Sequence, residues 1–228
     1  MTLAELRSQI LDLLDLTIRP LQSSAYTSTC RTGILDMAIA NALRWLSLHA
    51  PVDLLDGSDE VGADGIFLTD GTTGMTVDDG EIELPSDFVR LSRVRAASWH
   101  KAVSEAIYDT SDKALMLSDA IARATADRPV AVLSCKENKI LSLHPYDSDV
   151  DGTGVGEEIE LTSVRMPLAQ IAAVLTGSAA AVIPLPPKCV ASLLYQSAGY
   201  TLATMRDSDA KMFFDIAGTF VQWPQTPR

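Results

Sequence analysis

The sequence predicts a mixed α+β protein, and three observations support this fold class. Apolar residues recur at helical spacing near the N-terminus and again near the C-terminus. Between these stretches, short apolar runs alternate with turn-forming Gly and Asp, which is typical of strands and hairpins. We therefore expect N- and C-terminal helical hairpins, residues 1–51 and 184–222, to form one bundle. A β-rich insertion with one short helix is expected over 52–183, and a tail over 223–228.

The first predicted helix covers residues 2–17. Thr2 and Glu5 have the spacing of a capping box, and Pro20 ends the helical pattern. Its apolar stripe comprises Leu3, Leu6, Ile10, Leu13 and Leu14.

A second helix is predicted over 28–49 and stops before Pro51. It can pair with the first helix as an antiparallel hairpin. Its expected inner face comprises Ile34, Ala38, Ala42, Trp45 and Leu46.

The middle of the chain is rich in Gly and Asp over 53–81 and then contains longer apolar runs. The stretch 88–99 does not alternate cleanly between apolar and polar residues, so we expect a bulge or bend there. The Ala-rich stretch 168–182 fits either a short helix or a connection. The predicted elements are strands over 66–68, 75–77, 82–84, 88–99, 130–134, 139–144 and 158–166, and a helix over 112–125.

Two helices are predicted after the proline-rich run that begins at Pro184, over 188–205 and 208–221. Asp207 or Ser208 is expected to cap the second helix. The two apolar faces comprise Val190, Leu194, Ala198, Thr201, Leu202 and Met205, and Phe213, Phe214, Ala217 and Val221.

Composition and charge exclude several classes of protein. Hydrophobic residues make up 47% of the 228 residues, which excludes a generally disordered chain. The net charge of −12, from 18 basic and 30 acidic residues, argues against DNA binding through phosphate contacts. The cluster Arg90, Arg93 and Arg95 is more simply explained by alternation along a strand. No apolar run approaches the roughly 20 residues of a membrane helix, so no membrane partner is expected.

The N-terminal segment and the cysteines together predict a protein made in a reducing compartment. Glu5 and the acidic residues at 12 and 15 interrupt any apolar core of a signal peptide. The three cysteines, Cys30, Cys135 and Cys189, are far apart and form no CxxC pair, so we expect neither a disulfide framework nor a zinc site.

No known catalytic motif is present, and we expect neither an enzyme nor a cofactor. His49, His100 and His144 have no partner at metal-ligand spacing. If the chain were an enzyme, its best candidates for catalytic residues would be His100, His144 and Glu105. Cys135 lies beside a lysine, but no base is identifiable for it.

One stretch matches a calcium-loop pattern. Asp147, Asp149, Asp151 and Glu158 occupy the carboxylate positions of D-x-D-x-D-G-x5-E, and Gly152 allows the turn between them. The expected flanking elements are strands, whereas an EF-hand needs helices. We therefore favour an acidic turn, and a calcium-dependent interaction module remains the alternative.

Three aromatic residues are candidates for contacts with other chains. Trp223 lies in a short segment with two prolines and has little core of its own to join. It either docks on a neighbouring subunit or folds back onto its own helices. Phe213 and Phe214 are further interaction candidates.

Two stretches carry a resemblance to a known family. The segment Ile82–Trp99, IELPSDFVRLSRVRAASW, resembles the stretch of phage head-to-tail adaptor proteins in which Leu-Pro-x-Asp-Phe is followed by a strand and then a tryptophan. The run Ile183–Pro187, followed by a helix, a short turn and Asp209–Ala217, is similar to the helical pair in which adaptors often end. The general pattern resembles ring or tail-tubular proteins of podovirus-like phages, including the crAss-like group.

The resemblance implies a structural subunit of the virion, made in the host cytoplasm. Such proteins form closed rings, commonly of twelve copies, between the portal protein and other tail or ring proteins. DNA would pass through the ring channel without sequence-specific binding. The segments 53–81, 147–158 and the terminal tail are the expected arms for contacts between subunits.

Overall fold

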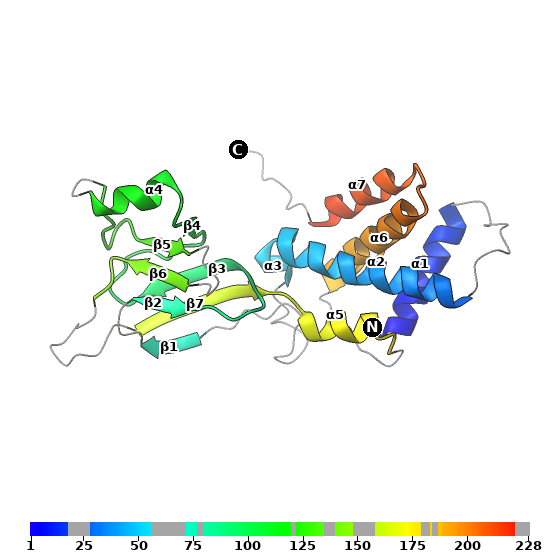
Figure 1. The fold of residues 1–228 in the computed structure, drawn as a ribbon, viewed down its shortest axis with the longest axis horizontal. Coiled ribbons are helices and arrows are strands. Elements are labelled where there is room, and N and C mark those ends of the chain that lie inside the picture. The colour runs from blue at the N-terminus through cyan, green and yellow to red at the C-terminus, as the bar shows by residue number, and fades with distance from the viewer. Residues whose placement is uncertain are drawn as a thin grey trace. The chain divides into compact units, whose positions relative to one another are not determined.

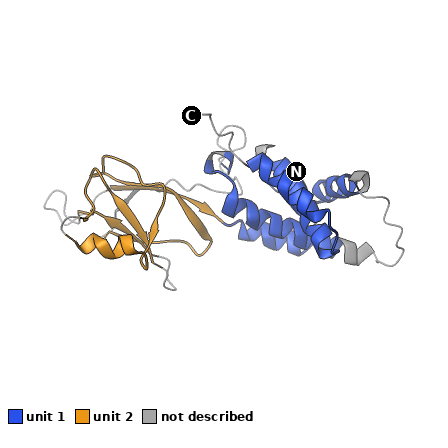
Figure 2. Ribbon diagram, turned by 90° about the horizontal axis from the view of Figure 1, so that it is seen from above, with its two compact units in different colours: residues 1–68, 166–228 blue, residues 69–165 orange. Residues whose placement is uncertain are grey.

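The computed structural model shows a mixed α+β protein (Figure 1). The chain divides into two compact units, shown in Figure 2. Unit 1 contains Met1–Leu68 and Met166–Arg228, and unit 2 contains Thr69–Arg165. The structure describes residues 1–17, 28–55, 72–76, 80–119, 122–134, 140–147, 158–178, 183 and 187–221.

These boundaries differ from the predicted insertion over 52–183. The helices α3 (Val52–Leu55) and α5 (Leu168–Leu175) both belong to unit 1. The reason is their packing, because α3 contacts α6 (Pro187–Thr204) and α5 contacts α2 (Ser28–His49). The Ala-rich stretch that the sequence left undecided is thus helical in its first half.

The helix α1 (Leu3–Thr17) begins at the predicted capping box. The Thr2 amide donates to Glu5 Oε2 at 2.8 Å, and the Glu5 amide donates to Thr2 Oγ1 at 3.2 Å. The hydrogen bond from the Thr2 backbone is the main reason that the pKa of Glu5 lies below its usual value. The side chains of α1 that are buried comprise Leu3, Leu6, Ile10 and Leu14.

The helix α2 has the predicted bounds, and its buried face includes Ala38, Ala42 and Leu46 of the predicted one. Ile34 and Trp45, expected inside, are only half-buried. The reason is that α2 packs against both α5 and α6, so burial extends beyond the predicted stripe. The fully enclosed positions include Leu35, Ile39, Leu43 and Leu46.

The helix α6 is the centre of unit 1. It packs against α1, α2, α3 and α7 (Ala210–Val221) (Figure 1). Gly199 is required where α6 meets α7, because a Cβ there would lie 2.7 Å from Cδ1 of Phe214. The Cys189 thiol donates to the Leu54 carbonyl at 3.4 Å and ties α6 to α3.

The link between α6 and α7 is short, as predicted. Asp207 Oδ1 accepts from the Asp209 amide at 2.9 Å, which assigns the capping role to Asp207. Arg206 ends α6 in the left-handed region, with φ of 59°. The Asp207 amide donates to the Leu202 carbonyl at 3.0 Å and so closes the helix end.

A partly buried ion pair joins α1 to α2. Arg7 donates from Nε to Asp36 Oδ1 and from Nη2 to Asp36 Oδ2, both at 2.7 Å. The two side chains are 15% and 10% exposed. The pair lies beside the end of α5, because a Cβ on Gly177 would be 3.7 Å from Arg7 Nη2. The fork-to-fork geometry satisfies both charges at one place in the fold.

Unit 2 consists of two small sheets with strand orders β1-β7-β3 and β2-β6-β5-β4. Neighbouring strands are antiparallel, except that β4 runs parallel to β5. The strands are β1 (Thr72–Thr76), β2 (Glu81–Glu83), β3 (Phe88–Ala96), β4 (Ile107–Tyr108), β5 (Val130–Leu133), β6 (Ile140–His144) and β7 (Glu158–Arg165). The predicted strand over 66–68 lies outside the described residues.

The predicted helix over 112–125 is wrong beyond residue 118. Only α4 (Asp112–Leu115) and a 3-10 turn (Met116–Ser118) form. Asp119 is extended, with ψ of 135°, and so ends the turn. Helix propensity alone, which is weak, favoured the longer helix.

The strand β3 contains two irregularities, which confirms the bulge predicted from its sequence. Between Phe88 and Arg90, and again between Leu91 and Arg93, the register shifts, so that two residues of β3 lie opposite one residue of β7. The extra residues keep Phe88, Leu91 and Val94 all buried, although a regular strand would alternate their directions.

Trp99 completes the core of unit 2. Its side chain is 1% exposed, and its Nε1 donates to the Pro145 carbonyl at 2.7 Å. The strand itself ends earlier, at Ala96. The residues of this core are Ile82, Leu84, Phe88, Leu91, Val94, Ala96, Trp99, Ala131, Leu141, Leu143, Ile159 and Leu161.

We expect Asp36→Asn to lower the free energy of unfolding of unit 1 by about 2–3 kcal/mol, because it leaves the Arg7 charge partly buried without a carboxylate. Urea denaturation followed by the helical circular dichroism signal measures this change. Asp215→Asn is the matched control, since its ion pair with Lys211 is 85% and 68% exposed and should contribute nothing measurable. Equal losses in both variants would contradict the role of the Arg7–Asp36 pair.

Candidate functional site

Unit 1 exposes large apolar side chains on the outer faces of several helices. Met37 on α2 is 59% exposed, and Leu168 at the start of α5 is 49% exposed. Apolar side chains that a monomer leaves exposed in groups mark surfaces for other chains. The exposed set in unit 1 is Leu11, Met37, Leu48, Leu168, Leu175, Met205, Met212 and Phe220.

A groove of about 380 Å³ lies between α2 and α6. Met37 and Ile34 line it from α2, and Tyr200 and Thr204 line it from α6. No lining residue is charged, although the chain as a whole carries a net charge of −12. The groove therefore suits an uncharged apolar segment better than a charged one.

The aromatic residues of α7 divide between core and surface. Phe213 is 1% exposed and packs beside Tyr195, with ring centroids 5.9 Å apart, so its ring belongs to the core of unit 1. Phe214 is half-buried and meets Tyr200 edge to face at 5.1 Å. Phe220 is the exposed aromatic, at 43%, although sequence reasoning did not single it out. Trp223 lies outside the described residues.

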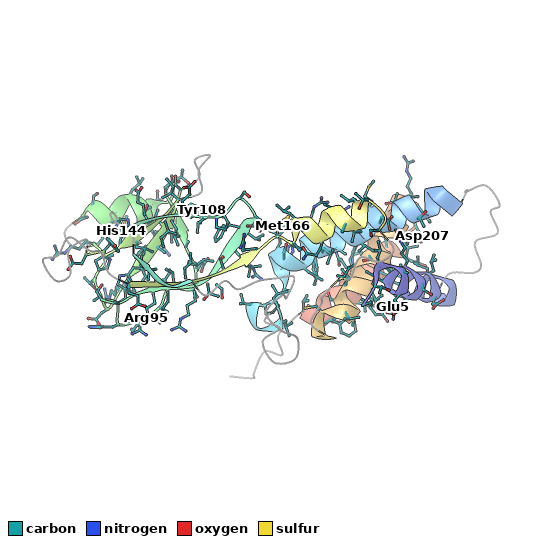
Figure 3. The ribbon with its side chains drawn as sticks, turned by 90° about the horizontal axis from the view of Figure 1, so that it is seen from below. Glu5, Arg95, Tyr108, His144, Met166 and Asp207 are labelled. Atoms are coloured by element: carbon teal, nitrogen blue, oxygen red, sulfur yellow. The ribbon has the colours of Figure 1, made fainter. Side chains whose placement is uncertain are left out.

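Unit 2 has a smaller apolar surface around the edge strand β4. Tyr108, labelled in Figure 3, and the two exposed residues Leu115 and Met116 form it. A depression of about 340 Å³ adjoins it, with Glu105 and Lys113 in its lining. Strand edges with free main-chain groups are the usual places for a further strand to add.

The predicted calcium loop connects β6 of one sheet to β7 of the other. Of its four carboxylates, Asp147 and Glu158 are described and exposed, whereas Asp149 and Asp151 lie outside the described residues. Among the residues whose positions the structure gives, no group of three or more His, Cys, Asp or Glu side chains is close enough to hold a metal ion. The loop therefore remains a prediction from its sequence.

In the described part of the chain, the three candidate catalytic residues do not share one site. These residues are His100, His144 and Glu105. His100 Nδ1 and Asp127 Oδ1 form an exposed pair at 2.8 Å, and this contact is the main reason that the pKa of Asp127 is lowered. Glu105 lines the depression beside β4 instead. His144 lies at the end of β6. Burial lowers the pKa of His144, and the negative charge of Glu81 raises it by a smaller amount.

The basic cluster on β3 lies along a strand, as the sequence indicated. Arg93 and Arg95 are exposed, two positions apart, and Arg95 (labelled in Figure 3) lies opposite Glu160 of β7. Burial lowers the pKa of the half-buried Arg90. Unit 2 has 10 basic and 18 acidic residues, a net charge of −8. The arginines are thus a local feature of an acidic unit.

Comparison with known proteins does not assign the chain to a family. No protein-family model matches the sequence, and no curated protein is significantly similar to it. Within the described parts of the chain, no helix is long and apolar enough to cross a membrane.

We expect the stability of unit 2 to fall as the pH is lowered through about 6.5, the pKa of histidine in an unfolded chain. The folded-state pKa of His144 is lowered, so below that pH the unfolded state binds more protons and is favoured. Thermal unfolding at pH 7.5 and 5.5 measures the difference. His144→Gln should reduce it, and an unchanged pH dependence in His144→Gln would contradict the assignment.

Proposed function

We propose that this chain is a structural ring subunit of the head-to-tail connector of a tailed bacteriophage. The subunit joins the portal protein to the tail, and twelve copies enclose part of the DNA channel. The finer arrangement proposed for it is a bundle of N- and C-terminal helical hairpins that carries the β-rich unit. The family resemblance of Ile82–Trp99 and of the C-terminal helical pair motivates this proposal.

The observation that carries the proposal is the exposed apolar surface of unit 1. A ring subunit needs two different surfaces that complement each other from one copy to the next. Unit 1 offers exposed apolar side chains on separate helices, including Leu168 on α5 and Phe220 on α7. Burying such side chains between copies would stabilise the ring by removing apolar area from water.

The charge of the chain is compatible with a channel for DNA. The acidic excess is greatest in unit 2, with its net charge of −8. Acidic walls repel the phosphate backbone, so DNA can move past them without binding. In this proposal unit 2 contributes the acidic surface, and Trp223 docks on a neighbouring subunit.

Light scattering on a size-exclusion column tests the ring. Twelve chains of 24.5 kDa correspond to about 290 kDa, and we expect this species either alone or after addition of the portal protein. The double variant Leu168→Glu with Phe220→Glu should reduce the ring population about tenfold or more, because charges at a contact between apolar surfaces remain unpaired.

The matched control is Ala169→Glu with Thr219→Glu, which adds the same charge at neighbouring exposed positions of the same two helices. This control should assemble like the unaltered chain. A chain that stays monomeric at all concentrations, with and without portal protein, would overturn the ring proposal.

A second candidate is a calcium-dependent interaction module that uses the loop from Asp147 to Glu158. The match of the loop to the calcium pattern, with both described ends exposed, favours this candidate. In it, Asp147, Asp149, Asp151 and Glu158 would surround a structural ion.

If the loop holds calcium, millimolar calcium should raise the melting temperature of the chain, and a chelator should reverse the rise. Differential scanning calorimetry measures the shift. Asp149→Asn with Asp151→Asn should abolish it, whereas Asp78→Asn with Asp79→Asn, in another acidic stretch, should leave it unchanged. A melting temperature that is indifferent to calcium would sink this candidate.

A further inference from the structure

Among the described elements, the helix α7 packs mainly against one neighbour. It packs against α6, and no other described element contacts it to a comparable extent. In contrast, α6 also packs against α1, α2 and α3. Separation of α7 from α6 would therefore leave the contacts among the other described helices of unit 1 in place.

The contact between α6 and α7 is specific. Ser192 Oγ donates to the Ala217 carbonyl at 3.1 Å, and both residues are buried. The ring of Tyr195 lies near Phe213 and also stacks with Phe220 at 5.6 Å. Because these contacts depend only on the two helix surfaces, α7 from a second copy can reproduce all of them.

The segment between the two helices holds a strained turn. Arg206 has φ of 59°, a conformation that costs a residue with a Cβ free energy and that glycine adopts freely. The linker from Met205 to Asp209 contains neither Gly nor Pro, so it can also extend or continue as a helix. Opening the hinge would release the strain of the closed turn, and short strained hinges favour exchange of elements between copies.

We propose that α7 is exchanged between copies of this chain, with α7 of one copy docked on α6 of the next. The Met205–Asp209 hinge opens to allow this, and the α6–α7 contacts are conserved in the exchanged form. Exchange from each copy to the next is a head-to-tail interface that can close into a ring. The closing of exchanged copies into a ring rests on the proposed function. The exchange of α7 itself can be measured whatever the size of the ring.

Two single-cysteine variants mixed together test the exchange. Ser192→Cys and Ala217→Cys are given tags of different mass, unfolded, mixed and refolded together under oxidising conditions. A disulfide between the two chains forms when α7 of one copy lies on α6 of the other. We expect this mixed product on a non-reducing gel, at a yield at least tenfold above the control. Each variant is built in a chain whose native cysteines, Cys30, Cys135 and Cys189, are replaced by serine.

The matched control pair is Met37→Cys with Thr204→Cys. These residues line the groove between α2 and α6, two helices that do not exchange in the proposal. The double variant Ser192→Cys with Ala217→Cys in one chain establishes that the two positions can form a disulfide. A bond that forms only within single chains, with no mixed product above the control pair, would overturn the exchange.

The hinge supplies a second measurement that does not depend on disulfide geometry. Arg206→Gly should lower the oligomeric fraction at least threefold by relieving the closed turn. Deletion of Ser208 and Asp209 should raise that fraction, because the shortened linker cannot form the turn. A deletion variant that remains monomeric by light scattering at the same concentration would also overturn the exchange.

The two proposals fail in different ways. A ring of about 290 kDa without a mixed disulfide product would sink the exchange and leave the ring. A mixed product found only in a dimer would support the exchange and sink the ring.

Discussion

The structure of unit 1 depends on the burial of α6. Between Lys188 and Arg206 the chain contains no charged residue, so this helix cannot lie at a solvated surface without exposing apolar area. The helices α1, α2, α3 and α7 cover it, and each gains in return a surface on which to bury its own apolar stripe. The ion pair between Arg7 and Asp36 then links two of the covering helices, α1 and α2.

Much of the secondary structure could be predicted from local signals. The ends of α1, α2, α6 and α7 lie close to their predicted positions because caps and prolines mark them. The bulges of β3 were visible as broken alternation. The buried face of α2 was predicted only in part, since periodicity does not reveal that neighbouring helices pack on α2 from two sides. The contact between Arg7 and Asp36 joins residues 29 positions apart, and neither residue carries a local signal for it.

The candidate surfaces were harder to predict than the fold. Phe213 and Phe220 lie on the same helix and have the same chemistry, yet one is enclosed and the other is exposed. Their difference arises from how α7 lies on α6, which a single sequence does not encode locally. The exposed position of Met37 has the same origin, because an apolar residue on a long helix is ordinarily expected in the core. By contrast, the charge of the chain and its division into helical and β-rich stretches could be predicted directly from the sequence.

Because unit 1 is assembled from segments on both sides of unit 2, the order of synthesis matters for this chain. A ribosome makes α1 and α2 first and α6 only after all of unit 2. During that interval, on the order of ten seconds at ordinary rates of protein synthesis, the apolar faces of α1 and α2 have no α6 to cover them. Unit 2 already has its complete sequence at that stage and can fold beside the growing chain. The nascent chain therefore presents its early helices to chaperones, or to other nascent copies on the same messenger RNA, before its own core exists.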